Sequence, residues 1–254
     1  MPSRFTGYLR ASRAPRHSLV FALPLLVLYE ILAAGLSGQQ IGEVRNGADV
    51  LLKSVFASLG GRYGVLGASV VLFGIGAWLV WRDRRAHGEI RPGIFVGMFL
   101  ESMLYALVLG VVASTLTSLL LHGRLVLAAG GGQRAGGVAS FALPTQLMIS
   151  LGAGIYEELL FRVLLVSGLA LLARTVIGLP TVAAGVFAAI IGAVIFSLFH
   201  YVGQFGDAFT VRSFTFRAVA GLLFSALYLT RGFGITAWSH ALYDVILSLW
   251  SQGG

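Results

Sequence analysis

Apolar runs of about 20 residues recur along this chain, and no other feature limits its fold as strongly. An α-helix rises about 1.5 Å per residue, so such a run crosses the roughly 30 Å hydrocarbon core of a bilayer. The clear runs cover residues 18–37, 63–81, 93–121, 144–173, 180–202, 214–230 and 234–250. The sequence predicts an all-α, polytopic transmembrane bundle of seven helices. Eight is the alternative if residues 49–59 form an amphipathic helix at the membrane interface.

Composition agrees with this class of protein and limits the available chemistry. Only 11% of the residues are charged, against about 25% in a soluble globular domain. The chain has no cysteine, which excludes disulfides, thiolate-bound zinc, iron-sulfur clusters and a cysteine nucleophile. A catalyst built on this chain must therefore use oxygen groups or imidazole.

The positive charge indicates membrane orientation and not nucleic-acid binding. The net charge is +8, but most arginines lie in short segments beside apolar runs, as the positive-inside bias predicts. Residues 1–17 and 82–92 are both rich in arginine. We therefore expect an integral protein of the bacterial inner membrane with a cytoplasmic N-terminus, in contact with membrane lipids and with no nucleic-acid partner.

One long polar connection divides the chain. Residues 122–142 include the glycine groups 130–132 and 136–137, and such a composition favours a flexible linker. We expect residues 1–142 to hold a basic tail and accessory transmembrane helices, and residues 143–254 to form the functional helical core.

Ionisable residues inside apolar runs are the candidates for function, because a charge at the bilayer centre costs about 3 kcal/mol on insertion scales. In the front half these are Glu30 and Glu101, which have no partner at a fixed spacing. We expect both to be packing or polar-cavity groups. The candidates in the back half are Glu157, Glu158, Arg162, His200, His240 and Asp244.

The densest group is Glu157, Glu158 and Arg162 within one apolar run. Adjacent residues of a helix point about 100° apart, so the two carboxylates have different surroundings. The i,i+4 spacing allows Glu158 to pair with Arg162. Glu157 is then left to face a cavity as the reactive group, although such a string is also common on solvated helix faces.

Two histidines lie in later apolar runs. His200 follows Phe196 by four residues, and His240 precedes Asp244 by four, which places that imidazole and carboxylate on one helix face. Taken singly, an interfacial histidine and a helix-packing pair are equally good readings. Together with Glu157 these groups can converge on a water, which the glutamate deprotonates and the imidazoles hold while stabilising an oxyanion. That is the chemistry of peptide-bond hydrolysis.

The ordered motifs resemble the signature of the CAAX prenyl protease and bacteriocin-processing family (CPBP, also ABI) of intramembrane endopeptidases, over roughly residues 144–250. The resemblance implies that Glu157 is the base that activates water and that His200 and His240 complete the site. Asp244 stands where the family has asparagine or aspartate. Glu158 and Arg162, with Phe196 of the second motif, would be supporting residues. It implies a peptide or membrane-protein substrate, with or without a lipid modification.

The sequence leaves the need for a metal open. Glu157, His200 and His240 are possible zinc ligands, and a site with an open position would activate water. However, the chain has no His-Glu-x-x-His helix, and Glu157 as a ligand would leave the site without its obvious base. We favour a glutamic endopeptidase that requires no metal or other cofactor, with a zinc-dependent metalloprotease as the alternative.

Two other functions compete with a protease. A transporter would use the same groups as a proton or cation path, and a non-catalytic immunity or scaffold protein would keep only the fold. Simple hydropathy also puts His200 and His240 at opposite depths, so we expect the connection 231–234 to dip into the membrane. A shared site requires the two imidazoles to lie within about 15 Å of each other, because both must reach one water.

Overall fold

The computed structural model describes residues 4–36, 45–123, 141–203 and 206–250, and this part of the chain is helical without strands. The all-α prediction is confirmed. The helices are α1 (Arg4–Arg13), α2 (Pro15–Leu36), α3 (Gly47–His87), α4 (Gly93–His122), α5 (Leu143–Gly152), α6 (Ser167–Thr175), α7 (Thr181–Phe199), α8 (Val211–Arg231) and α9 (Phe233–Trp250). Two π-helical segments, η2 (Ala153–Glu157) and η3 (Leu159–Val166), join α5 to α6. The predicted connection 122–142 lies largely outside the described residues.

Long apolar helices make up most of this part of the chain. Five of them, α2, α3, α4, α7 and α8, are long and apolar enough to cross a membrane. The segment from α5 through η2 and η3 to α6 is a further continuous helix over residues 143–175, and α9 has 18 residues. With these two, the described residues contain the seven long helices that the sequence predicts.

Helix α3 joins two predicted segments into one kinked helix. The kink lies at Gly60 and Gly61, and Gly61 has a φ of 55°, a left-handed conformation that favours glycine. The arm before the kink corresponds to the predicted amphipathic stretch 49–59, and the arm after it carries the predicted span 63–81. Whether the first arm lies at the membrane interface stays a prediction.

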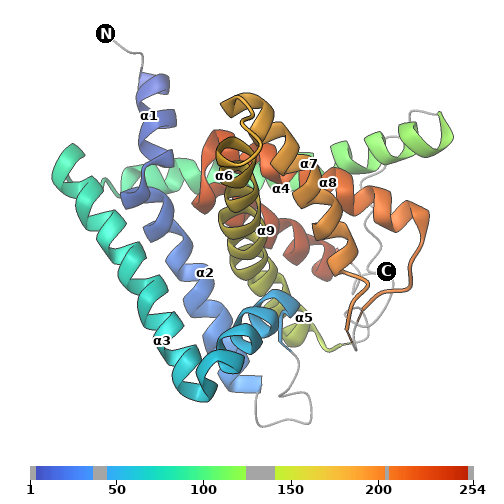
Figure 1. The fold of residues 1–254 in the computed structure, drawn as a ribbon, viewed down its shortest axis with the longest axis horizontal. Coiled ribbons are helices and arrows are strands. Elements are labelled where there is room, and N and C mark those ends of the chain that lie inside the picture. The colour runs from blue at the N-terminus through green and yellow to red at the C-terminus, as the bar shows by residue number, and fades with distance from the viewer. Residues whose placement is uncertain (1–3, 37–44, 124–140, 204–205, 251–254) are drawn as a thin grey trace.

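The helices surround the α5–α6 segment. Figure 1 shows α2 and α3 side by side at one edge of the molecule, with the long α5–α6 helix in the middle. Helix α9 packs against α2, α4, α5 and η2, so it lies inside the bundle. The last helix is thus placed against the segment that carries Glu157 and Glu158.

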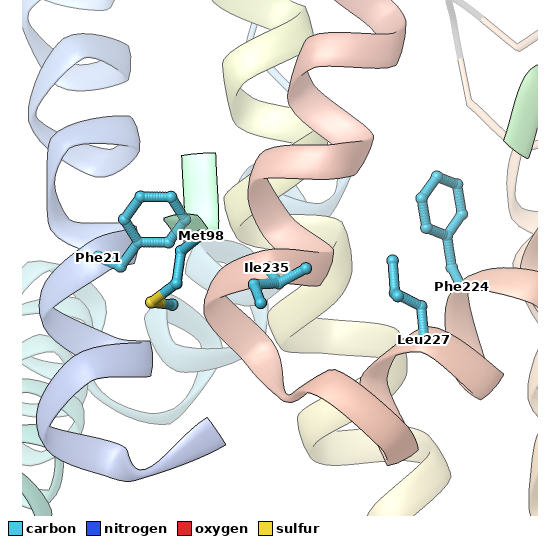
Figure 2. Packing of buried hydrophobic residues seen from close by; sticks show 5 residues of the cluster. All are labelled: Phe21, Met98, Phe224, Leu227 and Ile235. Carbon is cyan, nitrogen blue, oxygen red and sulfur yellow. The ribbon is translucent and has the colours of Figure 1, made fainter. Parts of the chain in front are cut away.

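The buried core is small and the apolar surface is large. One cluster brings together side chains from α2, α4, α8 and α9: Phe21, Met98, Phe224, Leu227 and Ile235 (Figure 2). Many other large apolar side chains point outward, and none of the most apolar window of α3 is buried. An apolar exterior of this extent is what lipid contact requires, and the chain is an integral membrane protein.

Glu101 lies in a partly buried polar cluster between α1, α4 and α8. Its carboxylate accepts two hydrogen bonds from Arg231, at 2.5 and 2.7 Å, and one from the Tyr8 hydroxyl at 2.6 Å. Burial, together with this hydrogen bond, raises the pKa of Tyr8, so the phenol remains a donor. The partners of Glu101 are remote in sequence, and its paired state agrees with the expected packing role.

Glu30 is also paired. Its carboxylate accepts hydrogen bonds from Arg45 at 2.7 Å and from the Tyr156 hydroxyl at 2.8 Å, and it lies 3.6 Å from the Lys53 ammonium. Like Glu101, Glu30 is therefore a polar packing group that joins separate helices. Its partners lie on α3, before α3 and on η2.

The short connection between α8 and α9 is packed inside the protein. Arg231 donates to the Leu9 carbonyl and the Ser12 hydroxyl of α1, and the Gly234 amide donates to the Ser18 hydroxyl of α2. A turn enclosed in this way is compatible with the expected dip of residues 231–234. Its depth in the membrane stays a prediction.

Candidate active site

The candidate residues of the first motif lie on wide, π-helical turns. Glu157 ends η2, Glu158 follows it, and Arg162 lies in η3. A regular α-helix was expected here, and that local expectation is wrong. Such π turns are uncommon and frequently occur at functional sites.

Small residues allow other helices to approach this segment closely. A Cβ atom added at Gly154 would lie 2.4 Å from the Ala237 carbonyl oxygen and 2.6 Å from the Ala241 Cβ, both on α9. Real Cβ atoms do not approach other atoms this closely, so only glycine fits. The contact brings α9, and with it His240, against the helix of Glu158.

Glu158 connects two other candidate residues. Its Oε2 lies 3.2 Å from the Arg162 Nε, so the predicted i,i+4 ion pair is present. Its Oε1 accepts a hydrogen bond of 2.6 Å from His240 Nδ1. Glu158 and Arg162 are 0% and 1% exposed, so this pairing is fully inside the protein. The link to His240 was not evident from the sequence.

Aromatic rings enclose the Arg162 guanidinium. It lies 4.4 Å from the ring centroid of Phe196 and 5.6 Å from that of Phe224. Cation–π contacts of this kind favour a desolvated charge. Phe196, the predicted supporting residue of the second motif, therefore contacts the arginine of the first.

Glu157 has different surroundings from Glu158, as predicted. Its Oε1 accepts a hydrogen bond of 2.8 Å from the Asn46 side-chain amide, and its Oε2 is buried with no protein hydrogen-bond partner. Glu157 is also close enough to His200 and His240 to interact with both electrostatically. One carboxylate oxygen is thus held by the protein, and the other is available for a water.

Asn46 is the site residue that sequence reasoning missed. It lies in the front half, just before α3, and is 3% exposed. The only local signal was an asparagine before a predicted helix, which indicates an N-cap and not a contact with a residue 111 positions away.

Phe196 also connects the two histidines. His200 stands at the end of α7, where its Nδ1 donates to the Phe196 carbonyl at 2.9 Å. The Phe196 ring centroid lies 4.8 Å from that of His200 and 6.3 Å from that of His240. The two imidazoles are therefore well within the limit of about 15 Å that a shared site requires.

His240 is fixed from three sides. Its ring stacks on Phe224 at a centroid distance of 4.6 Å, its Nδ1 bonds to Glu158, and its Nε2 lies 3.9 Å from Asp244 Oδ2. The i,i+4 spacing thus places His240 and Asp244 on one face of α9, as predicted. Because Nδ1 is engaged, Nε2 is the nitrogen left for a substrate or water.

The candidate zinc ligands do not form a ready metal site. Among the residues that the structure describes, no three histidine, aspartate or glutamate side chains are grouped as a metal ion would need. His200 and His240 each use Nδ1 within the protein, and Glu157 uses Oε1. One atom of each of these residues, Nε2 of the two histidines and Oε2 of Glu157, is therefore still available to a water or another ligand.

An apolar cavity adjoins the other side of the site helix. It has a volume of about 410 Å³ and lies between α2, α3 and η2, with Ile155, Tyr156 and Leu159 in its wall. Asp49 and Lys53 also line it. The cavity therefore contacts the residues on either side of Glu157 and Glu158 in sequence, but neither carboxylate.

Comparison with known proteins gives one result for the C-terminal part of the chain. Residues 139–246 match the family described as type II CAAX prenyl endopeptidase Rce1-like. No curated protein and no solved structure gives a match. The matched segment includes all three motifs, from Glu157 to Asp244. Over residues 139–246 the chain is therefore similar to the Rce1-like type II CAAX prenyl endopeptidases, which agrees with the resemblance of its motifs.

Proposed function

We propose that this protein is an intramembrane endopeptidase of the glutamic type, acting on a membrane-associated peptide that carries a lipid group. The observation that carries the proposal is the surroundings of the Glu157 carboxylate. One of its oxygens is held by Asn46, the other is buried without a protein partner, and two histidines lie close by. The family match supports protease chemistry for the same segment.

In this mechanism Glu157 accepts a proton from a water molecule, and the water oxygen attacks the carbonyl carbon of the scissile peptide bond. His200 donates from Nδ1 to Phe196, so its Nε2 is an acceptor that orients the water. When the C–N bond breaks, protonated Glu157 returns the proton to the leaving amine. Water is consumed, and one carboxylate and one amine are formed.

His240 stabilises the negative charge that develops on the carbonyl oxygen. Its Nδ1 hydrogen bond to Glu158 favours the charged imidazolium, whose Nε2–H then donates to the oxyanion. Asp244, near the same nitrogen, limits how the ring can turn. Arg162 pairs with the other oxygen of Glu158 at 3.2 Å and so holds the carboxylate that orients His240.

The apolar cavity supports a lipid-modified substrate. Its lining is almost entirely apolar side chains, and it lies beside the site helix between α2 and the long arm of α3. A hydrocarbon chain gains about 0.8 kcal/mol for each buried CH₂ group, so this wall would add affinity without touching the reacting atoms. We expect the enzyme to function in the bacterial inner membrane, with the arginine-rich end of the molecule in the cytoplasm.

Purified protein in detergent, mixed with a quenched-fluorescent peptide library made with and without a farnesyl thioether, tests the proposed activity. We expect cleavage of farnesylated members that continues in the presence of a chelator, with mass spectrometry identifying two peptide products. Absence of cleavage of every member by wild-type protein would contradict the endopeptidase. Loss on chelation with recovery on added zinc would contradict the metal-free form.

Filling the cavity tests the lipid site. Gly76 lines the cavity, and Gly74 does not. A Cβ atom added at either position would meet open space, so Gly74 is a matched control. Gly76→Leu is expected to raise KM about 10-fold for a farnesylated peptide but not for its unmodified form, whereas Gly74→Leu changes neither. Equal changes in KM for the two variants would show that the cavity does not bind the substrate.

A further inference from the structure

The start of α3 is seated on the candidate active site, although it belongs to the front half of the chain. Asn46 lies against Glu157, and a Cβ atom at the neighbouring Gly47 would lie 3.3 Å from the Phe199 ring. Phe199 immediately precedes His200. The N-terminal end of α3 therefore lies between the helix of Glu157 and the end of α7 that carries His200.

The orientation of the Asn46 amide is fixed by a second hydrogen bond. Asn46 caps α3, and its Oδ1 accepts from the Ala48 backbone amide at 2.9 Å. A backbone N–H can only donate, so the oxygen must face Ala48 and the NH₂ group must face Glu157. The contact with Glu157 is therefore a donor held against a carboxylate oxygen.

A buried network holds Asn46 in place. The Tyr29 hydroxyl accepts from the Asn46 backbone amide at 3.3 Å and donates to Asp49 at 2.8 Å. Arg45 and Lys53 contact the same aspartate at 2.6 and 2.7 Å. Tyr29 and Asp49 are both 0% exposed, so the two groups that position Asn46 are desolvated, while Arg45 and Lys53 are partly exposed.

Glycine at position 152 makes room for this arrangement on the site helix. A Cβ atom there would lie 2.6 Å from the Tyr29 ring and 2.7 Å from the Asn46 Cβ. Any larger residue would push Tyr29 and Asn46 away from the helix of Glu157.

We propose that Asn46 is a positioning residue for Glu157. Its amide holds Oε1 of the carboxylate in one rotamer, so that Oε2 is the oxygen that accepts the proton of the water. Asn46 acts through Glu157 and does not contact the substrate. This inference rests on the proposed function, and it adds a front-half residue to a site whose family match begins at residue 139.

Variants that keep the N-cap of α3 test the positioning role of Asn46. Serine is also a strong N-cap, so Asn46→Ser preserves the start of α3 but removes the amide that donates to Glu157. With the best-cleaved peptide of the library, we expect kcat to fall about 10- to 100-fold while KM stays within about 3-fold of wild type. Tyr29→Phe, which keeps the ring but removes the hydroxyl that positions Asn46, is expected to lower kcat about 3- to 10-fold.

The control is the N-cap of α8, where Thr210 accepts from the Ser213 amide on an exposed turn. Thr210→Ala removes a cap without touching Glu157, and we expect its kcat to match wild type. Wild-type kcat in Asn46→Ser, together with an inactive Glu157→Gln, would overturn the role of Asn46 and leave the proposed function standing. Absence of cleavage by wild type would overturn both.

Discussion

Glu157 and Glu158 are adjacent in sequence but differ in almost every contact. Glu158 is enclosed by an arginine and a histidine, so its charge is compensated. Glu157 is held by one neutral amide, and its second oxygen has no protein partner. The first arrangement gives both oxygens of a carboxylate a partner in the protein, and the second leaves one oxygen of a carboxylate for the proposed water.

Neutralising Glu158 is expected to destabilise the fold more than neutralising Glu157. Glu158→Gln leaves the Arg162 guanidinium buried without its counter-charge, and breaking such a pair costs about 3–5 kcal/mol. Thermal unfolding in detergent measures the loss. The double variant Glu158→Gln with Arg162→Met removes the unpaired charge and should recover most of the lost stability. An unfolding midpoint of Glu158→Gln equal to that of Glu157→Gln would contradict this account.

Sequence spacing predicts some of these contacts but not the others. The pair of Glu158 with Arg162 and the shared face of His240 and Asp244 follow from a four-residue separation on one helix. The bond from Glu158 to His240 and that from Asn46 to Glu157 join residues far apart in sequence. No local pattern encodes such contacts, because they depend on how the helices pack.

At the scale of elements, helix positions followed closely from hydropathy. The bounds of α4, for example, agree with the predicted run 93–121. Hydropathy did not predict the π turns or the kink of α3, because both arise from local backbone geometry that apolar periodicity does not report. One irregularity lies at the candidate residue Glu157, and the other lies in the helix that lines the apolar cavity.

Helix approach at Gly154 can be tested against a matched glycine. Gly154→Ala places a Cβ atom against Ala237 and Ala241, whereas a Cβ atom at Gly168 in α6 meets open space. We expect Gly154→Ala to destabilise the protein by about 1–3 kcal/mol and to lower kcat by moving α9 away from Glu158. Gly168→Ala should be neutral or stabilising by up to about 1 kcal/mol. Unchanged stability and activity of Gly154→Ala would contradict the close crossing.

For the whole molecule, the two halves defined by the sequence meet at the candidate site. Helix α9 packs on α2 and α4, and Asn46 of the front half contacts Glu157 of the back half. The division at residue 142 into accessory helices and a functional core stays a prediction. Sequence patterns could locate the back-half residues because they form recognisable motifs, while the front half contributes through tertiary contacts alone.

The basic end of the molecule predicts its orientation. Arg16 pairs with Asp83, and His17 accepts from the Arg91 amide, so the start of α2, the end of α3 and the start of α4 meet. The chain has no cysteine, and the Glu89 side chain there is 83% exposed. In Glu89→Cys, a membrane-impermeant maleimide should react only after the inner membrane is opened. Labelling of Glu89→Cys on closed spheroplasts would contradict the predicted cytoplasmic position of this end.

The most direct test of the central claim is the single-turnover cleavage rate of Glu157→Gln. Glutamine keeps the shape of the side chain and can still accept from Asn46, but it cannot take a proton from water. The account predicts a rate at least about 100-fold below wild type with unchanged thermal stability, whereas the exposed control Glu89→Gln cleaves normally. A Glu157→Gln rate close to wild type would show that another group activates the water.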